Sequence, residues 1–129
     1  MIMKYLKFVL LISLVFSFTG VSAQPEFNCG KLNKKATKQY DAAMSNYIQA
    51  QKLAPKLPAS ADRYYLEANR LFKEVIDIDA EYAPAYYYLG CINVFKKENN
   101  LNAAEKHFKK SIELCPDGLH DAYFQLGKI

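Results

Sequence analysis

The strongest constraint on this chain is that it repeats itself, with a period of 36 to 37 residues. The pattern A-x3-F-x2-V at residues 68–75 returns as A-x3-F-x2-S at 104–111, and Y-x2-L-G at 86–90 returns at 123–127. A third, weaker copy of the first pattern begins at Ala43. A fixed period of this length is typical of folds that stack one small unit on the next.

The apolar residues recur at helical spacing, and no stretch alternates apolar and polar residues as a strand would. We expect helices over 34–54, 60–79, 84–98 and 101–114, with a last helix from about 119. Pro55 and Pro58 would end the first helix, because proline lacks the amide that continues the hydrogen-bond ladder. Ser60 and Asn100 are suitable caps for the second and fourth helices. The sequence therefore predicts an all-α chain.

The repeated residues resemble the tetratricopeptide repeat family, in which each unit is a pair of antiparallel helices. Its first helix carries an aromatic residue followed by Leu-Gly, and its second carries alanine, an aromatic residue, a small residue and proline. One complete unit, at 83–116, and the helix before it supply the expected packing residues: Tyr86, Leu89, Gly90, Ala104, Phe108 and Pro116, with Ala68 and Phe72. Asn93 and Ser111 depart from the pattern, and two extra residues lengthen the turn at 97–100.

The resemblance implies an antiparallel helix-pair solenoid with a right-handed superhelix. We expect a helical repeat domain over 33–129, divided into an atypical pair (33–79), the complete repeat (83–116) and a half repeat (119–129). Units of this kind bury their faces only by stacking. The half repeat leaves Phe124 and Ile129 without a covering helix, so we expect the chain to be truncated at its C-terminus. The alternative is an ordinary helical bundle with chance similarity.

The first 23 residues have the order of a secretory signal peptide. Two lysines precede an apolar run at 8–18, and Val21-x-Ala23 supplies the small residues that a signal peptidase reads. We expect cleavage after Ala23, a secreted or periplasmic location, and a mobile N-terminal segment at 24–32. The apolar run is too short for a membrane anchor, so no membrane span is expected after removal of the signal. The remaining net charge of +2 gives no electrostatic reason to bind nucleic acid.

The sequence contains no motif that points to catalysis. It has no phosphate-binding glycine loop, no Cys-x-x-Cys and no zinc-protease motif. Asp77, Asp79 and Glu81 cluster near a helix end but lack the spacing of a calcium loop. We therefore expect no enzymatic activity, no cofactor and no metal.

The three cysteines form an odd set, so at least one thiol must remain unpaired. Antiparallel packing would separate Cys91 from Cys115 by more than a helical turn, whereas Cys29 could reach either of them. We favour the absence of any bridge, with Cys91 as a small packing residue and Cys115 in a loop. A bridge from Cys29 is the alternative.

In the resembled family, ligands lie along the concave side formed by the first helix of each unit. Carried over by position, the resemblance implies a partner-binding face of Tyr87, Cys91, Val94, Phe95, Phe124 and Lys128. Tyr87 and Cys91 stand where members that grip a C-terminal carboxylate have Lys and Asn, so that clamp is missing. An apolar and aromatic strip suits a protein or peptide partner.

These features together favour an exported, non-catalytic adaptor that binds protein or peptide. One alternative is the N-terminal structural arm of a cell-envelope, outer-membrane assembly or secretion complex, with its wall-binding domain outside this chain. Another is a docking segment for a downstream catalytic domain. Four lysines between 31 and 38 are interpreted as a solvated helix start, or alternatively as a patch that touches anionic lipid or wall material.

Overall fold

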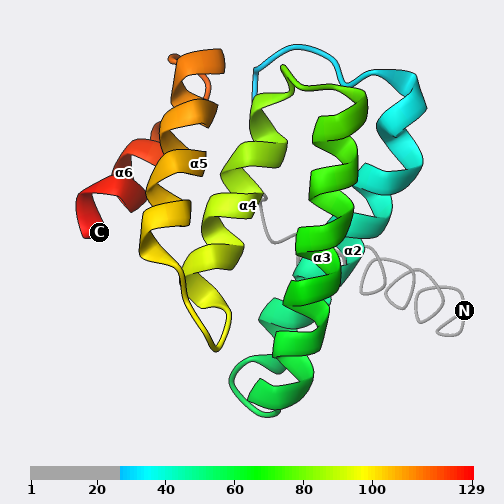
Figure 1. The fold of residues 1–129 in the computed structure, drawn as a ribbon, viewed down its shortest axis with the longest axis vertical. Coiled ribbons are helices and arrows are strands. Elements are labelled where there is room, and N and C mark those ends of the chain that lie inside the picture. Colours follow the sequence, from blue (N-terminus) through cyan, green and yellow to red (C-terminus); the bar gives the residue numbers. More distant parts are fainter. Residues whose placement is uncertain (1–26) are drawn as a thin grey trace, which may run out of the picture.

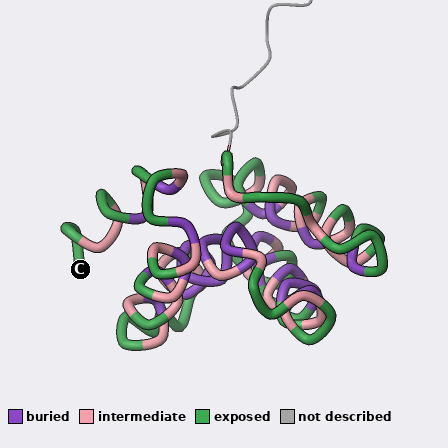
Figure 2. Tube along the Cα trace, turned by 90° about the horizontal axis from the view of Figure 1, so that it is seen from above, coloured by how far each residue is buried: buried purple, intermediate pink, exposed green. Residues whose placement is uncertain are grey.

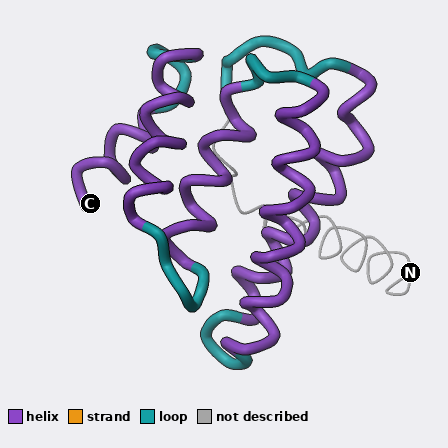
Figure 3. The backbone as a smooth tube through the Cα atoms, viewed as in Figure 1, coloured by secondary structure: helices purple, strands orange, loops and turns teal. Residues whose placement is uncertain are grey.

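The computed structural model describes residues 27–129, and every regular element in this range is helical (Figure 1). A single 3-10 turn (Lys34–Ala36) leads into α2 (Thr37–Leu53), α3 (Pro58–Ile78), α4 (Ala83–Phe95), α5 (Leu101–Leu114) and α6 (His120–Lys128). Short loops connect the helices, which run alternately up and down (Figure 3). The expected signal peptide at 1–23 lies outside the described residues.

The helices are stacked in series rather than around a closed centre. α2 packs on α3, α3 on α4, α4 on α5, and α5 on α6. Seen from above, α2–α3 and α4–α5 form two layers of helix pairs, and the buried residues concentrate where they meet (Figure 2). The expectation of an all-α helix-pair solenoid is therefore confirmed.

Two predicted helix ends were wrong by two or three residues. α3 begins at Pro58 rather than Ser60, and no side-chain cap is present. Proline fits the first turn because its missing N–H would have no partner there. α4 ends at Phe95 rather than residue 98. The predicted cap of α5 is present, since the Asn100 side-chain oxygen accepts a hydrogen bond from the backbone N–H of Ala103 at 3.1 Å.

The close approach of α4 and α5 depends on Gly90. A Cβ atom at this position would lie 2.7 Å from a ring carbon of Phe108, which is fully buried. A methyl group there would have to displace a packed ring, and overpacking of this kind destabilises a core. Leu89 and Ala104 are also fully buried, whereas Pro116 is exposed in the turn after α5.

An aromatic cluster joins the first helix pair to the second. Tyr88 of α4 stacks on Phe72 of α3 with ring centroids 5.3 Å apart and an interplanar angle of 11°. Tyr47 and Tyr40, both on α2, meet the rings of Tyr88 and Phe72 edge-on, at 5.1 and 6.0 Å. Offset and edge-on pairs add to the energy of burial. The core therefore lies where α2, α3 and α4 meet.

Candidate functional site: an apolar pocket and a covered groove

The segment before the helices is fixed by a disulfide. Cys29 is bonded to Cys115, with Cα atoms 5.5 Å apart and a sequence separation of 86 residues. This corrects the expectation that no bridge forms. It also corrects the expectation of a mobile N-terminal segment, as far as residues 27–32 are concerned. The physical reason is that α5 ends at the same end of the stack at which α2 begins (Figure 1). We call residues 27–32 the strap.

The strap covers part of the face on which we expected a partner. The Phe27 ring meets Tyr87 and Tyr88 edge-on, with centroids 5.0 and 5.8 Å away. Tyr87 is only 5% exposed, and its hydroxyl donates to the Asp121 carboxylate of α6. Cys91, one turn further along α4, is 2% exposed, and burial raises the pKa of its thiol to about 12. Tyr87 and Cys91 are therefore packed in this structure rather than open to a partner, and their role in binding one stays a prediction.

The other four predicted residues lie nearer the surface, in two separate places. Phe95 is 48% exposed at the end of α4, and the neighbouring Val94 is half-buried. Phe124 on α6 is 61% exposed, and the Lys128 ammonium lies 4.2 Å from the centre of its ring. Their role in binding a partner stays a prediction.

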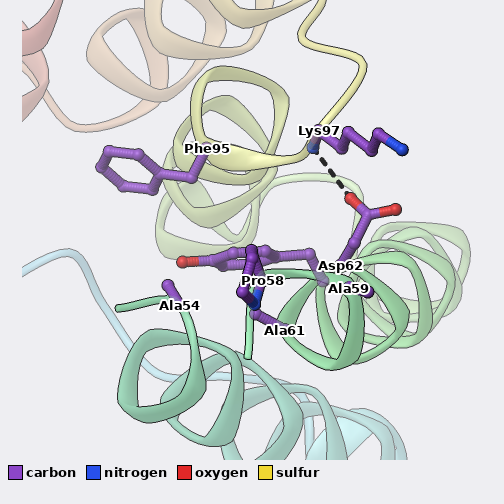
Figure 4. A pocket seen from close by; sticks show the side chains of 8 residues that line it. Ala54, Pro58, Ala59, Ala61, Asp62, Phe95 and Lys97 are labelled. Atoms are coloured by element: carbon purple, nitrogen blue, oxygen red, sulfur yellow. Dashed lines mark hydrogen bonds between the residues drawn. The ribbon is translucent and has the colours of Figure 1, made fainter. Parts of the chain in front are cut away.

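Phe95 stands over a pocket of about 370 Å³ at the end of the stack where α2 and α4 end and α3 begins (Figure 4). The lining is mostly apolar, and its members are Ala54, Pro58, Ala59, Ala61, Asp62, Tyr65, Phe95 and Lys97. The Tyr65 ring is buried and lies 6.4 Å from the Phe95 ring at a tilt of 34°. No residue of α6 lines this pocket, which we call the Phe95 pocket.

The polar groups that line the Phe95 pocket belong to Asp62, Tyr65 and Lys97. The Lys97 backbone N–H donates to Asp62 Oδ1 at 2.8 Å, which ties the N-terminal part of α3 to the loop after α4. The Lys97 ammonium points away from the pocket (Figure 4). Burial raises the pKa of the Tyr65 hydroxyl, which stays neutral at physiological pH. The pocket therefore suits one apolar or aromatic side chain.

The sequence analysis singled out Phe95 but not the side chains that form the walls of the pocket beside it. Ala54, Ala59 and Ala61 surround the turn at Pro58, and their short side chains leave the space beside Phe95 unfilled. This cluster of alanines next to a helix-starting proline was the available signal. Within residues 27–129, no three His, Cys, Asp or Glu side chains are grouped so that they could hold a metal ion.

Comparison with known proteins identifies a tetratricopeptide repeat at residues 83–117, which spans α4, α5 and the turn after them. This is the segment that the sequence predicted as the complete repeat, 83–116. No curated protein and no solved structure matches the chain significantly. Among residues 27–129, none of the helices combines the length and the hydropathy that a membrane crossing needs.

Proposed function

Starting from the tetratricopeptide repeat at residues 83–117, we propose that this protein is an adaptor that binds a protein or peptide partner and catalyses no reaction. Repeats of this kind are protein-interaction modules. The observation that carries the proposal is the exposed Phe95 ring at the mouth of an apolar pocket, at the end of the first helix of the repeat. Aromatic side chains beside such pockets are typical anchors of protein interfaces.

The chemistry of the Phe95 pocket favours an apolar side chain over a charged metabolite. Asp62 is engaged by the Lys97 backbone, and the Lys97 ammonium is directed to solvent. A negatively charged ligand would find no cation directed into the pocket, whereas an apolar side chain would remove both its own surface and that of Phe95 from water. The partner contact therefore centres on one apolar side chain of a protein or peptide.

The proposal includes export to the periplasm or the cell exterior, with cleavage after Ala23. Its support is the order of basic, apolar and small residues in the first 23 positions. The Cys29–Cys115 disulfide is a second, independent support, because structural disulfides persist in oxidising compartments and are rare in the cytosol. An envelope complex is the partner class that follows from this location.

A site-specific cross-link tests the binding proposal. A photoreactive phenylalanine analogue at position 95, in cells that make the protein, is expected to form one discrete adduct on illumination. The same analogue at Tyr123 is the matched control, since Tyr123 is an aromatic residue of equal exposure (49%) on α6, outside the Phe95 pocket.

The partner identified by this adduct then allows a measurement of affinity. Phe95→Ala is expected to weaken binding of that partner by at least about tenfold, because it removes the anchoring ring. Tyr123→Ala should leave the affinity within about twofold, as expected for a residue outside the interface core. Equal labelling at both positions, or an unchanged affinity of a folded Phe95→Ala variant, would reject the Phe95 pocket as the binding site.

A further inference from the structure

The strap lies against the helices without a backbone hydrogen bond to them. No backbone–backbone hydrogen bond joins residues 27–32 to any helix in the described part of the chain. Three side chains fix the strap: the Phe27 ring on α4, the Cys29 disulfide, and Leu32, which packs against the core. At the far end, the Asn33 N–H donates to Asp79 Oδ2 at 3.0 Å. The strap therefore has neither helix nor strand, with a bend at Cys29 and a positive φ of 85° at Gly30, and it is held by its side chains.

The place that Phe27 occupies is made by the repeat. Tyr87 and Tyr88 both belong to α4, and their rings lie 5.2 Å apart at an angle of 71°. The Phe27 ring contacts both of them. We call this surface the tyrosine seat. The seat is on the helix that also ends in Phe95, so the strap and a partner at the Phe95 pocket would lie along the same helix.

The disulfide ties the strap to the end of α5. With the bond intact, Cys29 cannot leave Cys115, and Phe27 is two residues away from it. Gly118 makes room for the bond, because a Cβ atom there would lie 2.5 and 2.6 Å from the two sulfur atoms. Cys115 is only 7% exposed, whereas Cys29 is half-buried, so an attacking thiolate finds Cys29 more easily.

We propose that the strap is a removable occupant of the tyrosine seat, and that opening the Cys29–Cys115 bond uncovers the seat for a partner peptide carrying an aromatic side chain in place of Phe27. The opening step is an exchange with a dithiol reductant. One of its thiolates attacks Cys29 Sγ and displaces Cys115 Sγ, which takes up a proton. The second thiol of the reductant then releases Cys29, so that the chain gains two thiols and the reductant becomes a disulfide.

The proposal deepens the proposed function and rests on it, since the strap would regulate how much of the repeat is open to a partner. Phe27 itself shows the chemistry of the ligand: an aromatic ring on a peptide segment, followed by the small residues Asn, Cys and Gly. After reduction the strap stays tethered through residue 33 and competes at a high local concentration. A partner therefore binds more weakly to the reduced chain than to a chain whose strap lacks the ring.

The first experiment observes the strap alone, without any partner. The chain has no tryptophan, so Phe27→Trp introduces one fluorescent indole at the seat. Reduction with dithiothreitol is expected to shift its emission to the red and to increase quenching by iodide. Cys91 should resist alkylation before and after, because its thiol is buried in the core. An unchanged emission after complete reduction would overturn the proposal, and so would a shift accompanied by alkylation of Cys91, which indicates unfolding.

The second experiment tests the seat with a defined ligand. The probe is a labelled peptide of residues 26–31 in which serine replaces Cys29, and the control peptide carries alanine in place of Phe27. The Phe27→Ala/Cys29→Ser variant is expected to bind the probe at least about tenfold more tightly than the oxidised wild-type protein, because no tethered ring competes. It should not bind the control peptide.

Equal affinity of the variant and the oxidised protein would overturn the proposal, provided that Cys91 of the variant stays protected. If the variant does not fold, the reduced wild-type protein takes its place, and failure of the probe to bind it above the oxidised protein would be the contradicting result. Neither experiment uses Phe95. A result that contradicts the strap proposal can therefore be distinguished from one that contradicts binding at the Phe95 pocket.

Discussion

Phe72→Ala is expected to lower the free energy of unfolding by about 3–5 kcal/mol, the largest effect of any single change discussed for this chain. Phe72 is fully buried, stacks on Tyr88 and receives the edge of Tyr40. Its truncation would leave a cavity between the first helix pair and α4, and the surrounding helices could not collapse into it completely. Urea unfolding followed by far-ultraviolet circular dichroism measures the loss.

Leu66→Ala is the matched control for this prediction, because Leu66 lies on the same helix but is 51% exposed. A surface truncation of this kind should change the stability by no more than about 0.5 kcal/mol. Two results would contradict the role of Phe72 in joining the helix pairs. One is an equal loss of unfolding free energy in both variants, and the other is a loss of less than about 1 kcal/mol in Phe72→Ala.

Loss of the disulfide is expected to cost about 2–4 kcal/mol. The bond closes a loop of 86 residues in sequence, so its removal frees a long stretch of the unfolded chain. Cys29→Ser removes the bond while leaving Phe27 and the helices unchanged. Its denaturation midpoint, measured without reductant, should fall below that of the wild-type protein.

Reductant separates this effect from an effect of the serine side chain. Dithiothreitol should lower the stability of the wild-type protein toward that of Cys29→Ser, and it should leave the variant unchanged because the variant has no bond to reduce. A wild-type protein indifferent to reductant would contradict a stabilising role for the Cys29–Cys115 bond.

The helical architecture could be predicted from the sequence because local residue patterns determine it. Helical spacing of apolar residues and the recurrence at 36 to 37 residues predicted helices that the structure confirms within three residues. One boundary error arises at Pro58, which we expected to help end one helix although it starts the next. A proline excludes a helix interior but is compatible with both positions, so the pattern alone could not decide.

The candidate site was only partly accessible, because its cover comes from far away in the sequence. Cys29 and Cys115 meet only once the two helix pairs have stacked, and no spacing rule encodes that meeting. Tyr87 was placed on an open face by its position in the repeat, yet Phe27 and Asp121 bury it. Phe95 stays exposed because the alanines near Pro58 leave the space beside its ring empty.

Intact-mass analysis after alkylation, on protein recovered from cells without reductant, tests most directly whether the chain is an exported protein built around the Cys29–Cys115 bond. The expected species begins at Gln24. It takes up at most one alkyl group in the native state, and one alkyl group, on Cys91, after denaturation, because Cys29 and Cys115 are bonded to each other. A species that begins at Met1 and takes up three alkyl groups would contradict both the export and the bond.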